Sequence, residues 1–308
     1  MLDHSDDFRH GLVLLAERGE DDRFAQLALA LSYPLSRRPV SSLVSVILDR
    51  CPETPAGLAA RVDLEWSTGH AEVCLAHVEQ LLGMVEPDHP WVVKALGAAC
   101  PAHSYTGDLG QMSAAAQRMV GHPAATDLER IEAVTLWALG ELYGGDVDAA
   151  ASVLEGNAEV LARGNTAVLS FLLAEIAAAQ ESDEALGWLE RGATEARQTG
   201  DFLLTRMIEV ARLAMLVRES EHGDALDLAL DLVPDLTRAG LMPQAWMSLR
   251  HVATLFAELG EPATALLILD SAAASEDAPE VVGDAVGQEA ELRHRIADDL
   301  AGTSTPGG

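Results

Sequence analysis

A small or apolar residue recurs at a nearly constant interval along this chain, each time shortly after a turn. The clearest example is LFAELGEPATALLILDSAA, residues 255–273, where one helical run ends at Leu259-Gly260 and a second begins after Pro262. The recurring positions are Cys74, Met112, Ala150, Ala185, Ala225 and Ala265, which stand 38, 38, 35, 40 and 40 residues apart. A repeat of this length predicts stacked helical hairpins, each of which buries its apolar face only against its neighbours.

The spacing inside each unit also predicts helices. Ala265, Leu269 and Ala272 are four and three residues apart, so they share one helical face. The preceding run carries a matching stripe, formed by Leu249, Val252, Ala253 and Phe256. The chain has 308 residues, of which 49% are hydrophobic but only 4% aromatic. Because Ala and Leu lose little freedom on entering a helix, we predict a folded, all-α protein.

A known repeat family has this pattern. The residues Leu249, Val252, Ala253, Phe256, Gly260, Ala265, Leu269 and Ala272 follow in order the tetratricopeptide consensus W-x2-L-G-x2-Y…G…A-x3-F-x2-A. Leu139-Gly140-x2-Tyr143 matches its first half a second time. The chain therefore resembles tetratricopeptide proteins, which implies an α-solenoid of such hairpins wound as a right-handed superhelix, here with a period of about 38 residues. The units exceed the family's usual length of roughly 34 residues, and the consensus tryptophan and closing proline are mostly absent.

A narrower resemblance comes from residues 4–31, HSDDFRHGLVLLAERGEDDRFAQLALAL, and from residues 86–120. Both are similar to the helical-repeat region of large STAND-like ATPase regulators of the LuxR and antibiotic-regulatory (SARP) kinds. The resemblance implies an arm that senses an inducer or a partner. The nucleotide-binding loop G-x-x-x-x-G-K-[ST] of such regulators is not found here, since the only lysine is Lys94 in Val92-Val93-Lys94-Ala95.

The positions of prolines and the local composition predict three regions. We expect an N-terminal helical cap over residues 1–50, the repeat array over 51–301, and a disordered tail over 302–308, which is rich in Gly, Ser and Thr. Prolines predict helix breaks at Tyr33-Pro34 and Glu86-Pro87, because proline cannot donate to the helical ladder. A polar helix near 280–300 is expected to cap the end of the array.

Charge and cysteine content restrict the partners and the compartment. The formal charge of −29 repels phosphate backbones and anionic lipid, so direct binding of nucleic acid is not expected, whereas cationic or mixed-charge partners fit better. The same charge has a simpler interpretation as an acidic surface that keeps the protein soluble. No apolar stretch reaches the roughly 18 residues of a membrane span. Three cysteines without a C-x-x-C pair indicate a reducing compartment, and we predict a cytoplasmic protein.

Consensus positions that usually face the groove of a tetratricopeptide array predict the binding residues. They are occupied here by Trp66, Lys94, Tyr105, Trp137, Glu141, Met207, Arg218, Met247 and Arg250. Aromatic residues, Met and Arg are common at binding hot spots. In the alternative interpretation, Trp137 and Met247 belong to the core between repeats and the arginines are solvated.

Two groups of residues raise the question of metal binding or catalysis. His70, Cys74 and His77 lie at helical spacing, as in a zinc site, but Cys74 occupies the small-residue position of its repeat and a fourth ligand is not evident. Cys100 lies near His103, without an orienting acid or oxyanion donors. We therefore predict no metal, no cofactor and no enzymatic activity.

The sequence thus predicts a protein that acts by binding. The leading hypothesis is a helical-repeat scaffold for a protein or peptide partner, as the sensor or interaction arm of a transcriptional or signal-transduction regulator. The alternative is a module that binds a small-molecule inducer in the concave groove, where binding tightens the superhelix. The sequence does not determine the oligomeric state.

Overall fold

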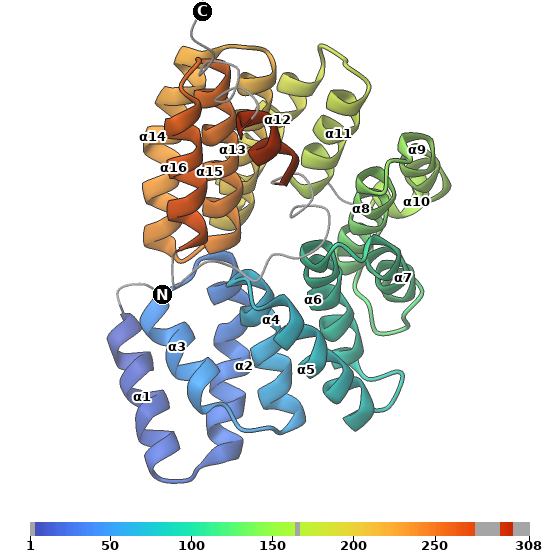
Figure 1. Ribbon diagram of the computed structural model, residues 1–308. Helices are drawn as coiled ribbons and strands as arrows, with labels where there is room; N and C mark the ends of the chain where they lie inside the picture. Colours follow the sequence, from blue (N-terminus) through green and yellow to red (C-terminus); the bar gives the residue numbers. More distant parts are fainter. Residues whose placement is uncertain (1–3, 164–166, 275–289, 298–308) are drawn as a thin grey trace, which may run out of the picture.

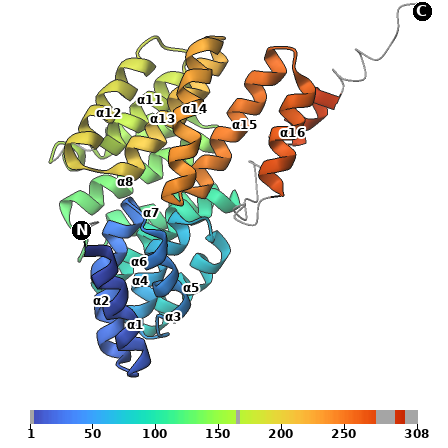
Figure 2. The same cartoon turned by 90° about the vertical axis from the view of Figure 1, so that its left-hand side faces the viewer.

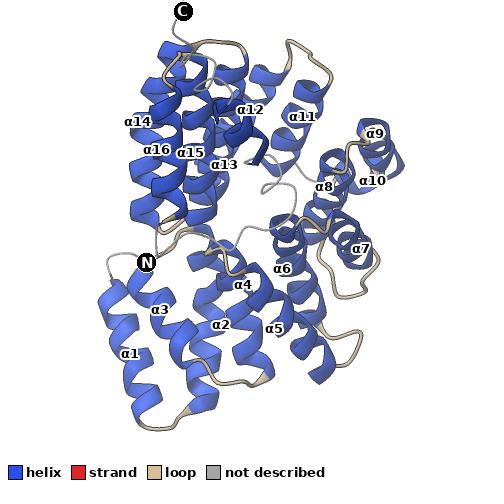
Figure 3. Cartoon of the chain, viewed as in Figure 1, coloured by secondary structure: helices blue, strands red, loops and turns tan. Residues whose placement is uncertain are grey.

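The computed structural model describes residues 4–163, 167–274 and 290–297, and these residues form helices and turns without a strand (Figure 3). The first half of the described chain contains α1 (Ser5–Glu17), α2 (Asp21–Arg37), α3 (Ser41–Arg50), α4 (Pro55–Ser67), α5 (Ala71–Met84), α6 (Pro90–Thr106), α7 (Leu109–Val120) and α8 (Asp127–Tyr143). The second half contains α9 (Val147–Gly156), α10 (Ala158–Leu161), α11 (Ala167–Ala179), α12 (Ala185–Thr199), α13 (Phe202–Arg218), α14 (His222–Ala239), α15 (Met242–Glu258) and α16 (Pro262–Ala273). The all-α prediction is confirmed.

The helices pair into hairpins as the repeat predicts. The pairs are α1/α2, α4/α5, α6/α7, α8/α9, α11/α12, α13/α14 and α15/α16, and the two helices of each pair pack against each other. At each turn one residue adopts a left-handed backbone conformation; these residues are Gly19, Gly69, Gly107, Gly145, Glu181, Ser220 and Gly260. A positive φ costs the five glycines little conformational energy. Glu181 and Ser220 adopt it, at φ 55° and 59°, although each has a Cβ that makes this conformation less favourable.

Side-chain caps fix the start of several helices. Asp108, Asp146 and Asp201 each accept a hydrogen bond from a backbone N–H in the first turn of α7, α9 and α13. At the start of α8, Thr126 and Glu129 form a reciprocal capping box. Asp108 and Asp146 thus cap the second helices of their hairpins, whereas Thr126 and Asp201 cap helices that begin new hairpins.

The predicted break at Tyr33-Pro34 is wrong, because α2 runs through Pro34 to Arg37. Leu31 and Leu35 flank the proline and are buried in the core of the N-terminal helices, which favours a continuous helix. Ala30, whose carbonyl loses its helical donor, is exposed to water. The hydrogen bond from the Arg38 N–H to the Pro34 carbonyl, at 3.0 Å, continues the helical ladder.

Leu139-Gly140, the second match to the repeat consensus, lies where α8 crosses α7. A Cβ on Gly140 would stand 2.6 Å from the Ser113 Oγ and 3.5 Å from the Leu109 carbonyl oxygen. The glycine therefore allows two helices to approach closely, which is the role that the consensus gives to a small residue.

The first helices of successive hairpins pack on one another. Contacts join α4 to α6, α6 to α8, α8 to α11, α11 to α13 and α13 to α15, while α4 packs on the second helix of the first hairpin, α2. In Figure 1, α6, α8, α11, α13 and α15 surround the middle of the molecule, so that the array curves. The described part of the chain is thus a helical-repeat solenoid whose first helices form its inner side.

The curvature brings the two halves of the chain into contact. Figure 2 shows α1–α6 below and α11–α16 above, and α13 contacts α2. Trp66 of α4 and Met207 of α13 pack against both of the two largest hydrophobic clusters. We call this contact between the N-terminal and C-terminal halves the seam.

The ends of the array differ from its middle. Residues 290–297 are helical, and Leu292 and Ile296 are buried against Ala253, Ala265 and Leu269 of the last hairpin. Helices α1–α3 share a hydrophobic cluster with Ala60 and Leu64 of α4, the helix that follows the predicted boundary near residue 50, and the division into a cap and an array stays a prediction. The tail predicted over 302–308 lies outside the described residues.

Candidate binding surface on the inner face

Polar side chains from five first helices gather on the inner side of the solenoid. We define the inner face by Tyr105 of α6, Tyr143 of α8, Glu175 of α11, Arg218 of α13 and Gln244 of α15. Gln244 is buried, at 2% exposure, and lies beneath this face. The five helices that carry them span residues 90 to 258 of the sequence. Only the stacking of successive hairpins places their side chains on one surface.

Tyr105 and Gln244 connect the most distant of these helices. The Gln244 side-chain amide donates a hydrogen bond of 3.0 Å to the Tyr105 hydroxyl, between residues 139 positions apart. Burial raises the pKa of the Tyr105 phenol to about 12, an effect that the hydrogen bond from Gln244 partly offsets. Tyr105 therefore stays neutral at physiological pH and serves as a hydrogen-bonding group.

Tyr143 and Glu175 form the second contact of the inner face. The Tyr143 hydroxyl donates to the Glu175 carboxylate at 3.5 Å, and 42% of Tyr143 is exposed. Burial raises the pKa of Glu175, while the Tyr143 hydrogen bond and the positive charge of Arg218 lower it. The Arg218 guanidinium itself donates to the Ala178 carbonyl at 3.4 Å. A phenol, a carboxylate and a guanidinium are thus presented together.

The nine residues predicted for the groove do not form one cluster. Tyr105 and Arg218 lie on the inner face, whereas Trp66 and Met207 lie in the seam. Trp137 and Glu141 bond to each other on α8, with 3.0 Å between the indole nitrogen and the carboxylate. On α15, Met247 is exposed and Arg250 stacks over the Trp246 ring at 4.5 Å.

Lys94 has a structural contact rather than an open surface position. Its ammonium pairs with the Asp63 carboxylate of α4, which also accepts a hydrogen bond of 2.8 Å from Ser32 of α2. Asp63 is buried, and burial raises the pKa of its carboxyl group although Lys94 and Ser32 lower it. The pair therefore connects α2, α4 and α6.

The sequence interpretation missed Glu175, Gln244, Tyr143 and His251. Tyr143 was visible as the closing residue of the second consensus match, but Glu175 and Gln244 carry no signal in a single repeat. His251 follows Arg250, and burial and the Arg250 charge lower its pKa to about 4, so its imidazole is neutral at physiological pH. Knowledge of which helices meet is needed to find these residues.

The cysteine and histidine groups are placed as packing and ion-pair residues. Cys74 is fully buried, and its thiol donates to the Val62 carbonyl at 3.4 Å. His77 bonds to the Glu65 carboxylate at 2.8 Å, while His70 is exposed. Burial raises the pKa of Cys100 to about 12. In the described ranges, no group of three His, Cys, Asp or Glu residues is arranged to hold a metal.

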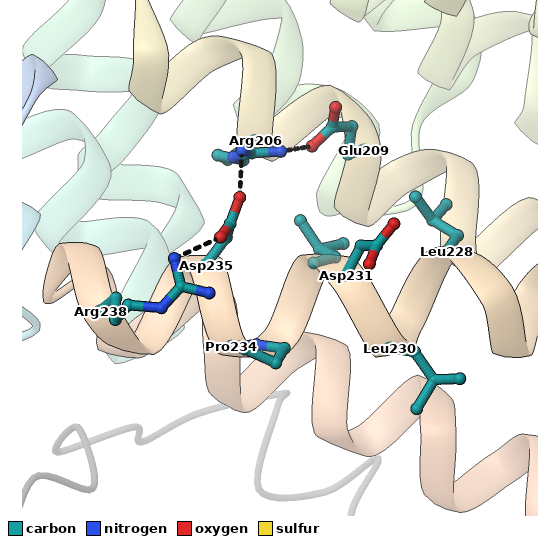
Figure 4. Close-up of a pocket in the computed structure, with 9 residues that line it drawn as sticks. Arg206, Glu209, Leu228, Leu230, Asp231, Pro234, Asp235 and Arg238 are labelled. Carbon is teal, nitrogen blue, oxygen red and sulfur yellow. Dashed lines mark hydrogen bonds and ion pairs between the residues drawn. The ribbon is translucent and has the colours of Figure 1, made fainter.

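The outer side carries a separate hollow of about 460 Å³ between α13 and α14 (Figure 4). Four of its charged residues bind one another, since Arg206 donates to Glu209 and Asp235, and Arg238 donates to the same Asp235 carboxylate at 2.7 Å. Leu230 on this side is 64% exposed. This surface provides matched control positions for tests of the inner face.

The comparisons with known proteins support the fold. A solved structure of a Rap protein complexed with competence and sporulation factor is similar to this chain with a TM-score of 0.55, at 12% identity, over 96% of this chain and 98% of that one. No family model and no curated protein matches the sequence. At such identity the likeness shows the helical-repeat fold alone, and the resemblance to LuxR and SARP regulators stays a prediction. No described helix is both long and apolar enough to cross a membrane.

Proposed function

We propose that this chain is a non-catalytic helical-repeat regulator that binds a protein or peptide partner on its inner face. In this proposal it acts as the sensor or interaction arm of a transcriptional or signal-transduction system. The single observation that carries the proposal is the gathering of Tyr105, Tyr143, Glu175, Arg218 and Gln244 from five separate helices.

The chemistry of these residues suits a polypeptide ligand. Phenol and guanidinium groups donate to backbone carbonyls, and a carboxylate accepts from backbone N–H groups. The buried Gln244 amide contributes by holding the Tyr105 hydroxyl. Tyr and Arg are also the residue types enriched at binding hot spots. A curved row of such groups matches an extended segment better than it matches a compact metabolite.

The Rap protein structure supports the same class of function. That protein, which is similar to this chain over nearly its whole length, was solved in complex with competence and sporulation factor. A solenoid of this kind is therefore able to bind a regulatory factor. In our proposal the present chain does so with its own inner-face residues.

The test uses the purified chain as bait and compares two double variants. Tyr143→Ala/Arg218→Ala removes two exposed inner-face side chains, whereas Leu230→Ala/Arg238→Ala removes two exposed side chains from the outer side. Proteins and small molecules retained from a native lysate are identified by mass spectrometry. The affinity of each candidate is then measured by calorimetry with the purified components.

We expect a polypeptide whose affinity falls at least about tenfold, or about 1.4 kcal/mol, in the inner-face variant and not in the outer variant. Equal retention by all three baits would contradict the assignment of the inner face. Loss of only a small molecule would favour inducer binding in place of a polypeptide partner. Circular dichroism of each variant confirms that the helices are intact.

A further inference from the structure

A second cavity, distinct from the inner-face cluster, lies where α2, α8, α11, α12 and α13 meet. Its volume is about 630 Å³, and it is lined among others by Tyr33, Arg37, Leu128, Glu132, Val168 and Asp201. This volume falls within the roughly 300–1,000 Å³ typical of ligand sites. We call it the junction pocket.

Part of the junction pocket is apolar and open to water. Tyr33 of α2 is 53% exposed and Leu128 of α8 is 58% exposed, although both are large hydrophobic side chains. Val168 and Leu204 extend the apolar wall. Exposed apolar side chains that line the same cavity favour occupation by an apolar group.

The polar wall carries three carboxylates, of Glu132, Glu195 and Asp201, beside the guanidinium groups of Arg37 and Arg38. The Arg37 guanidinium donates to Glu132 at 2.8 Å and pairs with Asp201 at 3.5 Å, so both of its terminal nitrogens are engaged. Only one oxygen of Glu132 takes part in these contacts. Glu195 is a third carboxylate of the lining, but it is already paired, since it accepts from Ser170 at 2.8 Å and from Arg191 at 3.0 Å. The oxygen of Glu132 that Arg37 does not engage is therefore the acceptor that the wall offers to a ligand.

The net negative charge of the whole chain also favours a cationic ligand. With 49 acidic and 20 basic side chains, the molecule attracts cations over a distance of about a Debye length, roughly 8 Å at physiological ionic strength. The Arg37 guanidinium already lies 5.3 Å from the centroid of the Tyr33 ring, but 53% of Tyr33 is exposed. A cation entering the pocket therefore meets the open part of this ring and the second carboxylate oxygen of Glu132. Aromatic rings attract cations within about 6 Å of the ring centroid.

We propose that the junction pocket binds an arginine or lysine side chain of a partner polypeptide, together with an adjacent apolar residue. The cationic group pairs with Glu132 and stacks on Tyr33, and the apolar neighbour packs on Leu128 and Val168. This proposal does not depend on the inner face, because the two sites share none of the residues that define them.

The probe is the peptide acetyl-Leu-Arg-Leu-amide, titrated into the 15N-labelled full chain and followed by NMR chemical shifts. Two further peptides replace the arginine by citrulline, which is nearly the same shape without the charge, or by glutamate. We expect saturable shifts for the arginine peptide, with at least a tenfold weaker dissociation constant for citrulline and still weaker binding for glutamate.

Variants place the binding in the pocket. Tyr33→Ser/Leu128→Ser should weaken binding of the arginine peptide at least fivefold. Leu230→Ser/Leu267→Ser, at positions on α14 and α16 that are slightly more exposed, should leave its affinity unchanged. Glu132→Gln keeps an acceptor for Arg37 and should remove the preference for arginine over citrulline. The proposal is overturned if no peptide binds, if the three peptides bind equally, or if the Tyr33/Leu128 variant retains wild-type affinity.

Discussion

At the scale of a residue, Lys94 was predicted to bind a partner, whereas in the structure it forms an ion pair inside the protein. Its position in the repeat consensus predicts exposure in the groove, but the interior of the N-terminal half places it against Asp63. A repeat pattern gives the face of a helix, and it does not give the residue that the next helix presents there. The ion pair was therefore beyond what the sequence pattern predicts.

We expect Lys94→Met to lower the free energy of unfolding by about 3–5 kcal/mol at pH 7, because it leaves the Asp63 carboxylate buried without its cation. The pKa of Asp63 is already raised by burial, and losing Lys94 raises it further. A raised pKa of an acid means that the folded state prefers the neutral form. The loss in the free energy of unfolding should therefore shrink as the pH falls from the raised pKa of Asp63 in the folded state towards about 3.9, its value in the unfolded chain.

Urea unfolding of the wild type and Lys94→Met at pH 7 and pH 5 measures this difference. The matched control is Asp63→Asn/Lys94→Met, which removes both charges and should recover much of the stability with little dependence on pH. A deficit that is equal at both pH values in the single variant would show that lost packing, and not the buried charge, causes the destabilisation.

At the scale of an element, the hairpin turn is the feature that the sequence predicts best. Spacing and glycine positions are local, and they located the turns after α4, α6, α8 and α15 and also those at Glu181 and Ser220, which lack glycine. The predicted break at Pro34 failed because burial of Leu31 and Leu35 outweighs the missing donor. Local rules hold where tertiary packing does not oppose them.

One turn without glycine, at Ser220, and one turn with glycine, at Gly260, give predictions of opposite sign. Ser220→Gly should raise the stability by roughly 0.5–1 kcal/mol, because the left-handed conformation costs a residue with a Cβ about 1–2 kcal/mol and glycine much less. Gly260→Ala, at the equivalent turn of the next hairpin, should lower it by about 1–2 kcal/mol. Urea midpoints at an unchanged slope measure both, and shifts of the same sign would contradict the explanation.

At the scale of the whole molecule, the period of the repeat predicts a curved solenoid but not the seam. Contacts between adjacent hairpins follow from the repeat itself, whereas the meeting of α2 with α13 depends on how much each unit turns relative to the last. Small differences in helix length and crossing angle accumulate along the array. The inner face and the junction pocket depend on the total of these small differences along the array. Glu175, Gln244 and Tyr33 were therefore not identified from the sequence.

The charge of −29 also acts on the whole molecule. Repulsion among the acidic side chains opposes the compact state, and salt screens it, since the Debye length falls from about 30 Å at 0.01 M to about 8 Å at 0.15 M. We expect the melting temperature to rise by several degrees between these NaCl concentrations. Sucrose at matched osmolality separates screening from solute exclusion, and a falling melting temperature would mean that exposed ion pairs outweigh the repulsion.

The hydrogen bond between Tyr105 and Gln244 has a consequence for synthesis of the chain. Hairpins fold from local contacts as they leave the ribosome, but this bond joins residues 139 positions apart and waits for α15. Until then Trp66, which packs against residues of α13 to α15, keeps part of its indole uncovered. The N-terminal half thus emerges with an unfinished apolar surface, and a ribosome that stalls before residue 244 leaves that surface open to chaperones.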